Sequence, residues 1–255
     1  MQLKNIFIVG AGNVASHLAL ALSKVVNIVG VCSLNSHSAK DLSVKLNVPF
    51  FDSISSIPNC DLVLVCVNDD SVGKVVKAIP SSFRIAYTSG SVELNSLPKL
   101  DKIGVFYPLQ TFSKTKSISL SNVPFLIESS DETFEKELME LASLLSVNVS
   151  LANSTDRKKL HLAAVFVNNF SNHLAFIAKK YLDENNLNWD YLKPLMFETV
   201  SKITEVSPYD AQTGPARRND SNIIETHLKE LNGLEKEIYQ VISSNIINTY
   251  HKKND

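Results

Sequence analysis

Hydrophobic and polar positions divide this chain into two parts with different periodicities. Up to about residue 152, short apolar runs alternate with segments whose apolar residues recur every three or four positions. Short runs are typical of buried strands, and the wider spacing is typical of helices. From residue 153 onward, only the helical spacing remains. The pattern predicts an α/β domain over residues 1–152 and an all-helical domain over residues 153–255.

Eight apolar runs are the candidate strands of the first domain. The run at residues 61–67, DLVLVCV, is continuous and rich in valine, as expected for a parallel sheet covered by helices on both faces. Helical spacing separates several of these runs, so the alternation predicts a Rossmann-type, doubly wound parallel sheet. The predicted strands cover residues 6–9, 27–32, 48–51, 61–67, 84–87, 103–106, 124–128 and 147–151.

A glycine motif, GAGNVA at residues 10–15, follows the first predicted strand and opens the first helix. Gly10 permits a tight turn, Gly12 lets the backbone approach a pyrophosphate, and Ala15 lets the helix pack closely on its strand. Free N–H groups at the start of the helix, around Asn13 and Val14, would hold the phosphates. The motif predicts a dinucleotide site; the alternative is a βα turn that binds nothing.

The residues after the second strand bear on the choice of cofactor. NAD sites usually place a carboxylate here for the ribose 2′-hydroxyl. Residues 33–38 read SLNSHS, and no carboxylate occurs before Asp41. We therefore expect NADP, with NAD as the alternative, unless this polar loop touches no ligand. The candidate groups for a 2′-phosphate are Ser33, Asn35, Ser36, His37 and Lys40.

Polar residues also follow the fourth, fifth and sixth strands. Ligands of doubly wound sheets lie beyond the carboxyl ends of the strands, so these residues should border one crevice. We expect Val67 and Asn68 beside the cofactor's ribose, and Ser89 and Gly90 beside its nicotinamide. Ordinary turn chemistry is the alternative. The candidate substrate residues after the sixth strand are Tyr107, Pro108, Gln110 and Thr111.

The first helix of the second domain is expected to run from residue 154 or 155 to about residue 182. Its apolar stretch at residues 160–170 favours a position in a bundle or between subunits. His161 and Asn168 lie seven residues apart and so share a face, with Asn172 one turn further. This polar stripe either lines a substrate cleft or bonds to neighbouring helices. Imidazole groups ordinarily titrate near neutral pH, so His161 is the candidate acid–base group and Asn168 the candidate for orienting substrate.

A polar, turn-rich loop at residues 207–220 interrupts the later helices. It carries Thr213 and two adjacent arginines, Arg217 and Arg218. Loops of this kind can cover a site and offer an arginine to an anion. We expect Thr213 near substrate and Arg217 paired with a substrate carboxylate; a connector with solvated charges is the alternative.

Composition excludes several classes of function. The chain has 255 residues, of which 44% are hydrophobic and 20% charged, as in an ordinary globular protein. Its net charge of −1 gives no sign of a nucleic-acid surface, and no apolar run approaches the roughly 18 residues of a membrane span. The three cysteines lack metal-ligand spacing. We therefore expect no metal. The first strand begins too early to leave room for a targeting segment, so we expect a cytoplasmic protein.

Five segments of the chain resemble Rossmann-like proteins with a DUF2520 C-terminal domain, a family of candidate NADP oxidoreductases. The wider superfamily includes pyrroline-5-carboxylate reductase, 6-phosphogluconate dehydrogenase and F420-dependent NADP reductase. The resemblance implies a homodimer built through the helical domain. The segments are GAGNVASHL at 10–18, TSGS at 88–91, YPLQTFS at 107–113, HLAAVFVNNFSNHL at 161–174 and QTGPARRND at 212–220.

The chain departs from that superfamily at one position. Many of its hydroxyacid dehydrogenases have a catalytic lysine four residues before an asparagine on the long helix. Here Ala164 or Val165 precedes Asn168 or Asn169, and neither can transfer a proton. His161 is the candidate substitute.

Three functions follow from this sequence. The first is an NAD(P)-dependent oxidoreductase that acts on a small metabolite, favoured by the convergence of polar groups from sheet and helix. The second is a non-catalytic dinucleotide-binding sensor or regulatory subunit, favoured by the missing lysine. The third is an imine reductase, which needs less acid–base help because an iminium is already electrophilic.

Overall fold

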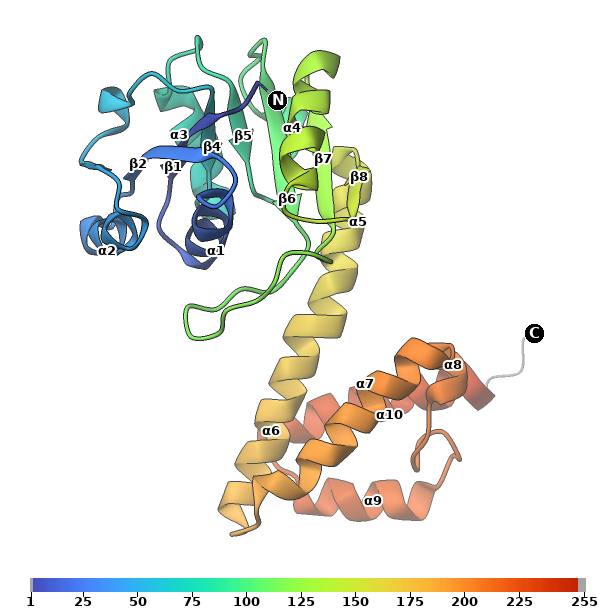
Figure 1. The fold of residues 1–255 in the computed structure, drawn as a ribbon. Coiled ribbons are helices and arrows are strands. Elements are labelled where there is room, and N and C mark those ends of the chain that lie inside the picture. Colours follow the sequence, from blue (N-terminus) through green and yellow to red (C-terminus); the bar gives the residue numbers. More distant parts are fainter. Residues whose placement is uncertain (1, 252–255) are drawn as a thin grey trace. The chain divides into compact units, whose positions relative to one another are not determined.

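A computed structural model describes residues 2–251 of the protein (Figure 1). These residues form two compact units, one ending at Asn169 and the other beginning at Phe170. Every described strand belongs to the first unit, and the second is helical. The predicted fold class, a Rossmann-type sheet followed by a helical region, is confirmed. The predicted domain boundary after residue 152 stays a prediction.

The first unit is built on one eight-stranded sheet with the order β3-β2-β1-β4-β5-β6-β7-β8. Neighbouring strands from β3 to β6 are all parallel. The strands are β1 Asn5–Val9, β2 Asn27–Cys32, β3 Phe50–Phe51, β4 Leu62–Val65, β5 Ile85–Tyr87, β6 Ile103–Pro108, β7 Phe125–Ser129 and β8 Val149–Leu151.

The direction of β7 differs from the predicted all-parallel sheet. β7 runs antiparallel to β6, with Tyr107 opposite Leu126 and Pro108 opposite Phe125. Parallel neighbours require a crossover, usually a helix. The connecting residues 109–124 contain no helix, so the chain turns back beside β6 in the opposite direction. This long connection, called the β6–β7 segment below, passes close to the first helix.

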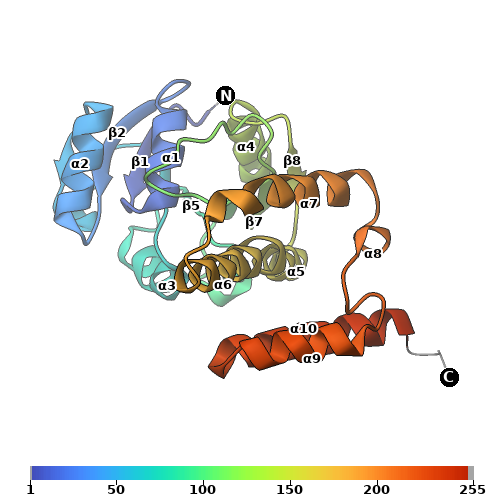
Figure 2. The same ribbon diagram turned by 90° about the horizontal axis from the view of Figure 1, so that it is seen from below.

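Helices cover both faces of the sheet (Figure 2). In β1, Ile6 and Ile8 pack into the cluster that holds α1 (Asn13–Leu22), α2 (Ser36–Leu46) and α4 (Glu132–Ser143). Phe7 and Val9 point to the opposite face, into the cluster that holds α3 (Asp69–Ala78). The alternation of side chains along a strand explains this division. Because both faces are covered, every one of these four residues is apolar and buried.

The predicted long helix contains a change of helix type. α5 (Ser154–Ala164) is followed by a π-helical segment, η3 (Val165–Phe170), and then by α6 (Ser171–Glu184). The helical stretch predicted to end near residue 182 is therefore present, and the π-helical segment within it was not predicted. A π-helical segment bonds each residue to the fifth along the chain, which shifts the later residues around the axis. No glycine or proline in VFVNNF signals this change.

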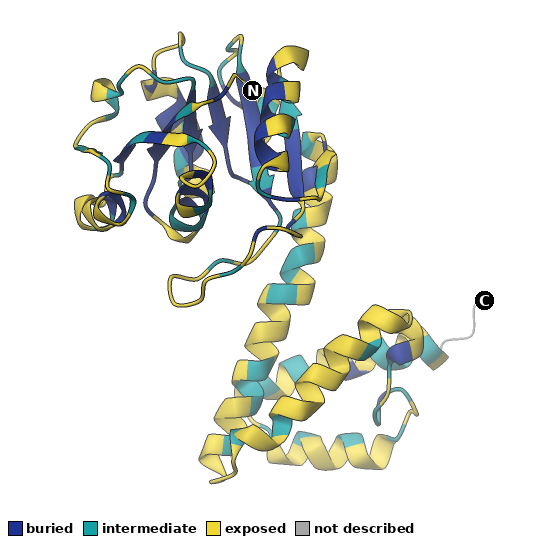
Figure 3. Ribbon diagram, viewed as in Figure 1, coloured by how far each residue is buried: buried dark blue, intermediate teal, exposed yellow. Residues whose placement is uncertain are grey.

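The second unit continues with η4 (Trp189–Leu192), α7 (Lys193–Glu205), α8 (Pro208–Ala211), α9 (Ser221–Glu230) and α10 (Gly233–His251). Most of its described side chains are exposed, in contrast with the buried sheet of the first unit (Figure 3). Among the described helices, none combines the length and apolar character needed to cross a membrane.

Candidate functional site

The turn between β1 and α1 forms a cradle of bare backbone. Gly10 has a φ of +120°, and a Cβ placed there would lie 2.1 Å from the carbonyl oxygen of Cys66. Gly12 is the N-cap of α1, has no side-chain cap and has no atom within 4 Å of where its Cβ would be. The first turn of α1 also contains no acidic residue. Its N–H groups are therefore open to an anion, and these residues fit a dinucleotide pyrophosphate.

A cavity of about 620 Å³ extends from this cradle across the ends of β2 and β4. Six of the twelve predicted cofactor residues line this cavity: Gly10, Gly12, Ser33, Asn35, Val67 and Asn68. Ser36 opens α2 beside it, while Asn13, Val14 and Ala15 form the first turn of α1. The roles of all twelve in binding remain predictions.

The same cavity contains residues that the sequence pattern did not indicate. Asp52 to Ser55, after β3, line it together with Lys74 of α3. β3 has only two residues, so its end is not marked by a long apolar run. The order of the strands could have indicated these residues. β3 lies beside β2 in the sheet, so the residues after β3 end at the same edge as the residues after β2.

The loop after β2 is held in shape by its own side chains. The Asn35 Oδ1 atom accepts a hydrogen bond of 3.0 Å from the backbone N–H of Ser38 and so caps α2. The backbone N–H of Asn35 donates to the Ser33 hydroxyl at 3.3 Å. These two hydrogen bonds hold the backbone of the predicted ribose-binding loop in place.

Three segments distant in sequence meet at Gly90. The Tyr107 hydroxyl and the His161 Nδ1 atom share a hydrogen bond of 3.0 Å. A Cβ on Gly90 would lie 2.7 Å from Cζ of Tyr107 and 2.8 Å from Nδ1 of His161. The adjacent Ser89 hydroxyl accepts the backbone N–H groups of Ser91 and Val92 at 3.1 and 3.0 Å. The structure therefore brings together the end of β5, the end of β6 and α5.

A cavity of about 390 Å³ opens beside this meeting point. Tyr107, Gln110 and Thr111, which were predicted to contact substrate, line it together with His161 and Asn168, the predicted catalytic residues. These roles stay predictions. Pro108 is buried in β6 and is not part of this lining. The remaining described lining residues are Leu109, Leu160, Ala163, Ala164, Val165, Val167 and Asn169. Of these, the sequence had singled out only Ala164, Val165 and Asn169, by comparison with the lysine and asparagine of related dehydrogenases.

Burial raises the pKa of the Tyr107 phenol, and the nearby Asp69 carboxylate raises it further, against a smaller opposing effect from Arg157. The phenol therefore keeps its proton at neutral pH. It can donate to a neutral His161 or accept from a protonated one. In either state Tyr107 leaves the Nε2 atom of His161 available to another group.

A buried ion pair fixes the first turns of α5 against the sheet. The Arg157 side chain is fully buried; it pairs with Glu128 of β7 and donates to the carbonyl of Val92 at 2.6 Å. The Ser154 hydroxyl donates to the Glu128 carboxylate at 2.8 Å. His161 lies one turn beyond Arg157 on α5. The network thus sets the position from which His161 reaches Tyr107.

The remaining predicted substrate residues belong to the second unit. Asn172 and Thr213 are exposed. The Arg217 guanidinium lies 4.1 Å from the centre of the Tyr250 ring, and its backbone carbonyl accepts from Nε2 of His251 at 2.8 Å. These contacts hold the 207–220 loop to α10, and the anion-binding role of Arg217 stays a prediction. Among the described residues, no group of three or more His, Cys, Asp or Glu side chains could hold a metal.

The parallel sheet and its glycine cradle define a dinucleotide-binding protein of the Rossmann class. Residues 4–84 match a family described as "Oxidoreductase family, NAD-binding Rossmann fold". Residues 123–246 match the domain of unknown function DUF2520. The first unit therefore carries an NAD(P)-binding Rossmann domain, as predicted.

Solved structures extend this likeness over the whole chain. A candidate NADP oxidoreductase, BF3122 from Bacteroides fragilis, is 35% identical, with a TM-score of 0.90, and the match covers 97% of this chain and 99% of that one. The chain thus belongs to the family of Rossmann proteins with a DUF2520 domain, and the resemblance is confirmed. Among curated proteins, none matches the sequence.

More distant structures share the fold alone. TM1727 from Thermotoga maritima is 19% identical, with a TM-score of 0.71, over 97% of this chain and 100% of that one. A reductive aminase from Aspergillus terreus, in complex with NADPH and ethyl-5-oxohexanoate, is 14% identical, with a TM-score of 0.62, over 98% and 87% of the two chains.

Proposed function

We propose that the protein is an NAD(P)-dependent oxidoreductase that transfers a hydride to or from a small metabolite. The reacting pair is a carbonyl and hydroxyl or an imine and amine. The observation that carries this proposal is the hydrogen bond between Tyr107 and His161 beside Gly90, at the edge of a cavity that Asn168 also lines. A nucleotide cradle together with an oriented acid–base group meets the main requirements for hydride transfer.

His161 is the group that moves the proton in this proposal. The bound cofactor supplies or accepts the hydride. Tyr107 occupies Nδ1 of His161, which leaves Nε2 as the atom that faces substrate. Because its pKa is raised, Tyr107 stays protonated at neutral pH, and in this proposal it orients His161 and does not supply the transferred proton. A protonated His161 therefore donates from Nε2 during reduction, and a neutral His161 accepts there during oxidation.

Asn168 orients the substrate in this proposal. Its amide can donate to a carbonyl oxygen or accept from an iminium N–H. The described lining of the cavity contains no lysine, arginine, aspartate or glutamate, and much of it is apolar. This lining favours apolar groups next to the reacting centre of the substrate. Arg217, from the second unit, is proposed to pair with a carboxylate on such a substrate.

We further infer a homodimer that forms through the helical unit. The only described hydrophobic residues buried in that unit are Ala211 and Ala216. Large apolar side chains such as Phe197 and Val241 are 77% and 68% exposed. Exposed apolar surface on this scale marks an interaction surface. A cytoplasmic location is also inferred, because the three cysteines are free thiols.

A dinucleotide-binding sensor is the second candidate function. It is favoured by Ala164 and Val165, which line the cavity at the positions where related dehydrogenases carry lysine. Neither side chain has proton-transfer chemistry. A sensor needs the cofactor cradle but not the pairing of Tyr107 and His161.

Binding followed by turnover tests the proposal. The purified protein is titrated calorimetrically with NADPH and NADH, and then offered cyclic imines, keto acids and hydroxyacids while the nicotinamide absorbance is followed. We expect cofactor binding and turnover of at least one class. His161→Gln should lower kcat by about 100-fold or more and leave cofactor affinity unchanged. His173→Gln, a histidine outside this cavity, is the matched control.

The other outcomes are distinct. Tight cofactor binding without turnover of any class supports the sensor. Turnover that His161→Gln does not change excludes His161 as the acid–base group. If neither cofactor binds, the oxidoreductase assignment is withdrawn.

A further inference from the structure

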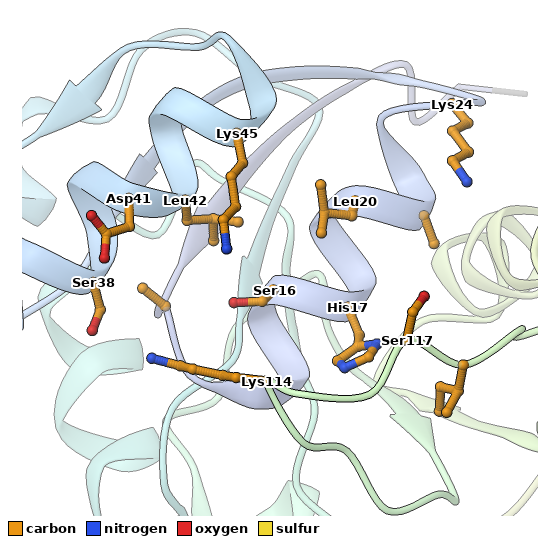
Figure 4. A pocket seen from close by; sticks show the side chains of 13 residues that line it. Ser16, His17, Leu20, Lys24, Ser38, Asp41, Leu42, Lys45, Lys114 and Ser117 are labelled. Carbon is orange, nitrogen blue, oxygen red and sulfur yellow. The ribbon is translucent and has the colours of Figure 1, made fainter.

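A second cavity, of about 250 Å³, lies between α1 and α2 and beneath the β6–β7 segment (Figure 4). We call it the basic pocket and define it by Ser16 and His17 of α1, Ser38 and Lys45 of α2, and Lys114 of the segment. Figure 4 shows Lys114 extending across the pocket toward α2, with Ser16 and Lys45 pointing into the same space. None of these residues is used by the proposed proton transfer.

The β6–β7 segment is fastened to α1 just before Lys114. The Asn13 side-chain amide donates to the carbonyl of Phe112 at 2.9 Å, and the His17 Nε2 atom donates to the carbonyl of Ser113 at 2.9 Å. The His17 ring also packs against Phe112, with 5.1 Å between centroids. Lys114 therefore directly follows two residues whose backbone carbonyls are hydrogen-bonded to the first turns of α1.

Within the described residues, the basic pocket has more positive than negative charge. Neither Lys45 nor Lys114 forms an ion pair with a described carboxylate. Asp41, which also lines the pocket, lies 3.6 Å from the Nε2 atom of His37. The lining has three lysines, Lys24, Lys45 and Lys114, against this one carboxylate. Two ammonium groups beside hydroxyls from Ser16 and Ser38 provide several donors and an excess of positive charge. This combination suits a doubly charged phosphate better than a carboxylate or a neutral group.

The position of the basic pocket favours one source for that phosphate. Ala11, within the glycine motif, lines both the basic pocket and the cofactor cavity. The backbone N–H of Ser38 donates a hydrogen bond to the side chain of Asn35, and Asn35 lines the cofactor cavity. The two cavities thus adjoin at the loop predicted to hold the adenosine ribose. A phosphate on that ribose would lie at their common edge.

We propose that the basic pocket binds a phosphate monoester dianion and that Lys114 is its main cation. The 2′-phosphate of NADP is the source that the position favours; this part rests on the proposed cofactor. Lys114 would then determine the preference for NADP from a segment about 80 residues after the loop that contacts the ribose. Free phosphate, or a phosphorylated metabolite, is the other source.

Cofactor affinity in matched lysine variants tests the proposal. Dissociation constants for NADPH and NADH are measured by calorimetry at one salt concentration, for the natural protein, Lys114→Gln and Lys116→Gln. Lys116 is exposed on the same segment but does not line the pocket, so it controls for net charge. We expect Lys114→Gln to weaken NADPH about 10-fold or more, with NADH unchanged. Lys116→Gln should change neither.

A second titration separates the two sources. Inorganic phosphate is titrated into the protein alone and into protein saturated with NADH, which lacks the 2′-phosphate. If Lys114→Gln spares NADPH but abolishes phosphate binding, the pocket is retained and the ligand is a free phosphate. The pocket is overturned if Lys114→Gln and Lys116→Gln weaken NADPH binding equally. It is also overturned if Lys114→Gln leaves NADPH affinity unchanged and phosphate does not bind the natural protein. If neither cofactor binds but phosphate does, the proposed function fails while the pocket stands.

Discussion

Gly90 acts at the scale of a single residue through the side chain that it lacks. The Tyr107 ring and the His161 imidazole occupy the space that a Cβ would need, within 2.9 Å of its position. Gly10 acts in the same way against the backbone of Cys66. Both glycines therefore permit close approach. Gly10 lets its turn approach the end of a strand, and Gly90 lets its turn approach the proposed acid–base group.

The roles of Tyr107 and His161 can be separated by mutation. Tyr107→Phe removes the hydrogen bond to Nδ1 but leaves the imidazole in place, so we expect kcat to fall about 10-fold. His161→Gln should cost about 100-fold or more. Because burial raises the pKa of Tyr107 above its usual value, loss of the phenol proton shifts to higher pH. The pH profile of the natural enzyme should then show no tyrosine limb below about pH 10.

The measurement is kcat against pH for the natural protein and both variants, with the substrate found in the turnover screen. Thermal unfolding of each variant controls for folding. A loss in Tyr107→Phe as large as that in His161→Gln would make Tyr107 the proton donor and would contradict the proposed division of roles.

At the scale of elements, local patterns predicted most of the first unit. Each predicted strand has a counterpart in the sheet, because a buried strand needs a run of apolar residues. The sequence also predicted part of the meeting of Gly90, Tyr107 and His161. Gly90 and Tyr107 follow neighbouring predicted strands, and the ends of parallel strands lie at one edge of the sheet. The orientation of Tyr107 toward His161 rather than toward solvent had no local signal.

Features that depend on distant partners were not predictable. The reversal of β7 is decided by the path of the β6–β7 segment and leaves no local signature in the strand. The π-helical segment at Val165–Phe170 has no glycine or proline to mark it. The burial of Arg157 depends on Glu128, 29 residues earlier. An arginine in the first turns of a helix is ordinarily a surface residue.

The Arg157 network is expected to hold α5 on the sheet. Removing one partner of a buried ion pair leaves the other charge uncompensated, at a cost of about 3–5 kcal/mol. Arg157→Met should therefore lower the free energy of unfolding by about that amount. Adding Glu128→Gln should recover part of the loss, because the stranded carboxylate is removed. Urea unfolding at neutral pH measures both. A loss below about 1 kcal/mol in Arg157→Met would contradict a structural role for the pair.

Asp61, just before β4, makes the stability of the sheet depend on pH. Burial alone would raise the pKa of Asp61, but hydrogen bonds from the backbone N–H groups of Asn5 and Lys4, at 2.8 and 3.0 Å, lower it overall. A carboxyl with a lowered pKa stabilises the fold above its unfolded pKa, near 4. That stabilisation is lost as the pH falls through the lower, folded pKa.

The free energy of unfolding should therefore differ most between the natural protein and Asp61→Asn at neutral pH, by about 1 kcal/mol. The difference should shrink below about pH 4. Asp101→Asn, at an exposed position, is the control. Denaturant unfolding across this pH range tests the prediction, and a difference that is constant with pH would contradict it.

At the scale of the whole molecule, the two units differ in how much apolar surface they bury. The first unit has two continuous clusters of buried residues on the two faces of its sheet. Neither cluster extends into the second unit. In that unit, even the single helix α7 has three large apolar side chains that are 60% or more exposed: Leu195, Phe197 and Val200. A helical unit of this size requires a larger core for stability. A second copy of the chain supplies that core if the helical units associate.

Phe197→Asp tests the proposed homodimer. Sedimentation should give the natural protein twice the chain mass of 28.2 kDa. A carboxylate placed in the buried centre of an interface is costly to desolvate, so Phe197→Asp should shift the protein toward the monomer. Val44→Asp provides the control, because Val44 is equally exposed, at 79%, but lies on α2 of the first unit. Cofactor affinity should persist in Phe197→Asp, since the glycine cradle belongs to the first unit. A monomeric natural protein would contradict the dimer and would require another partner to cover the apolar surface.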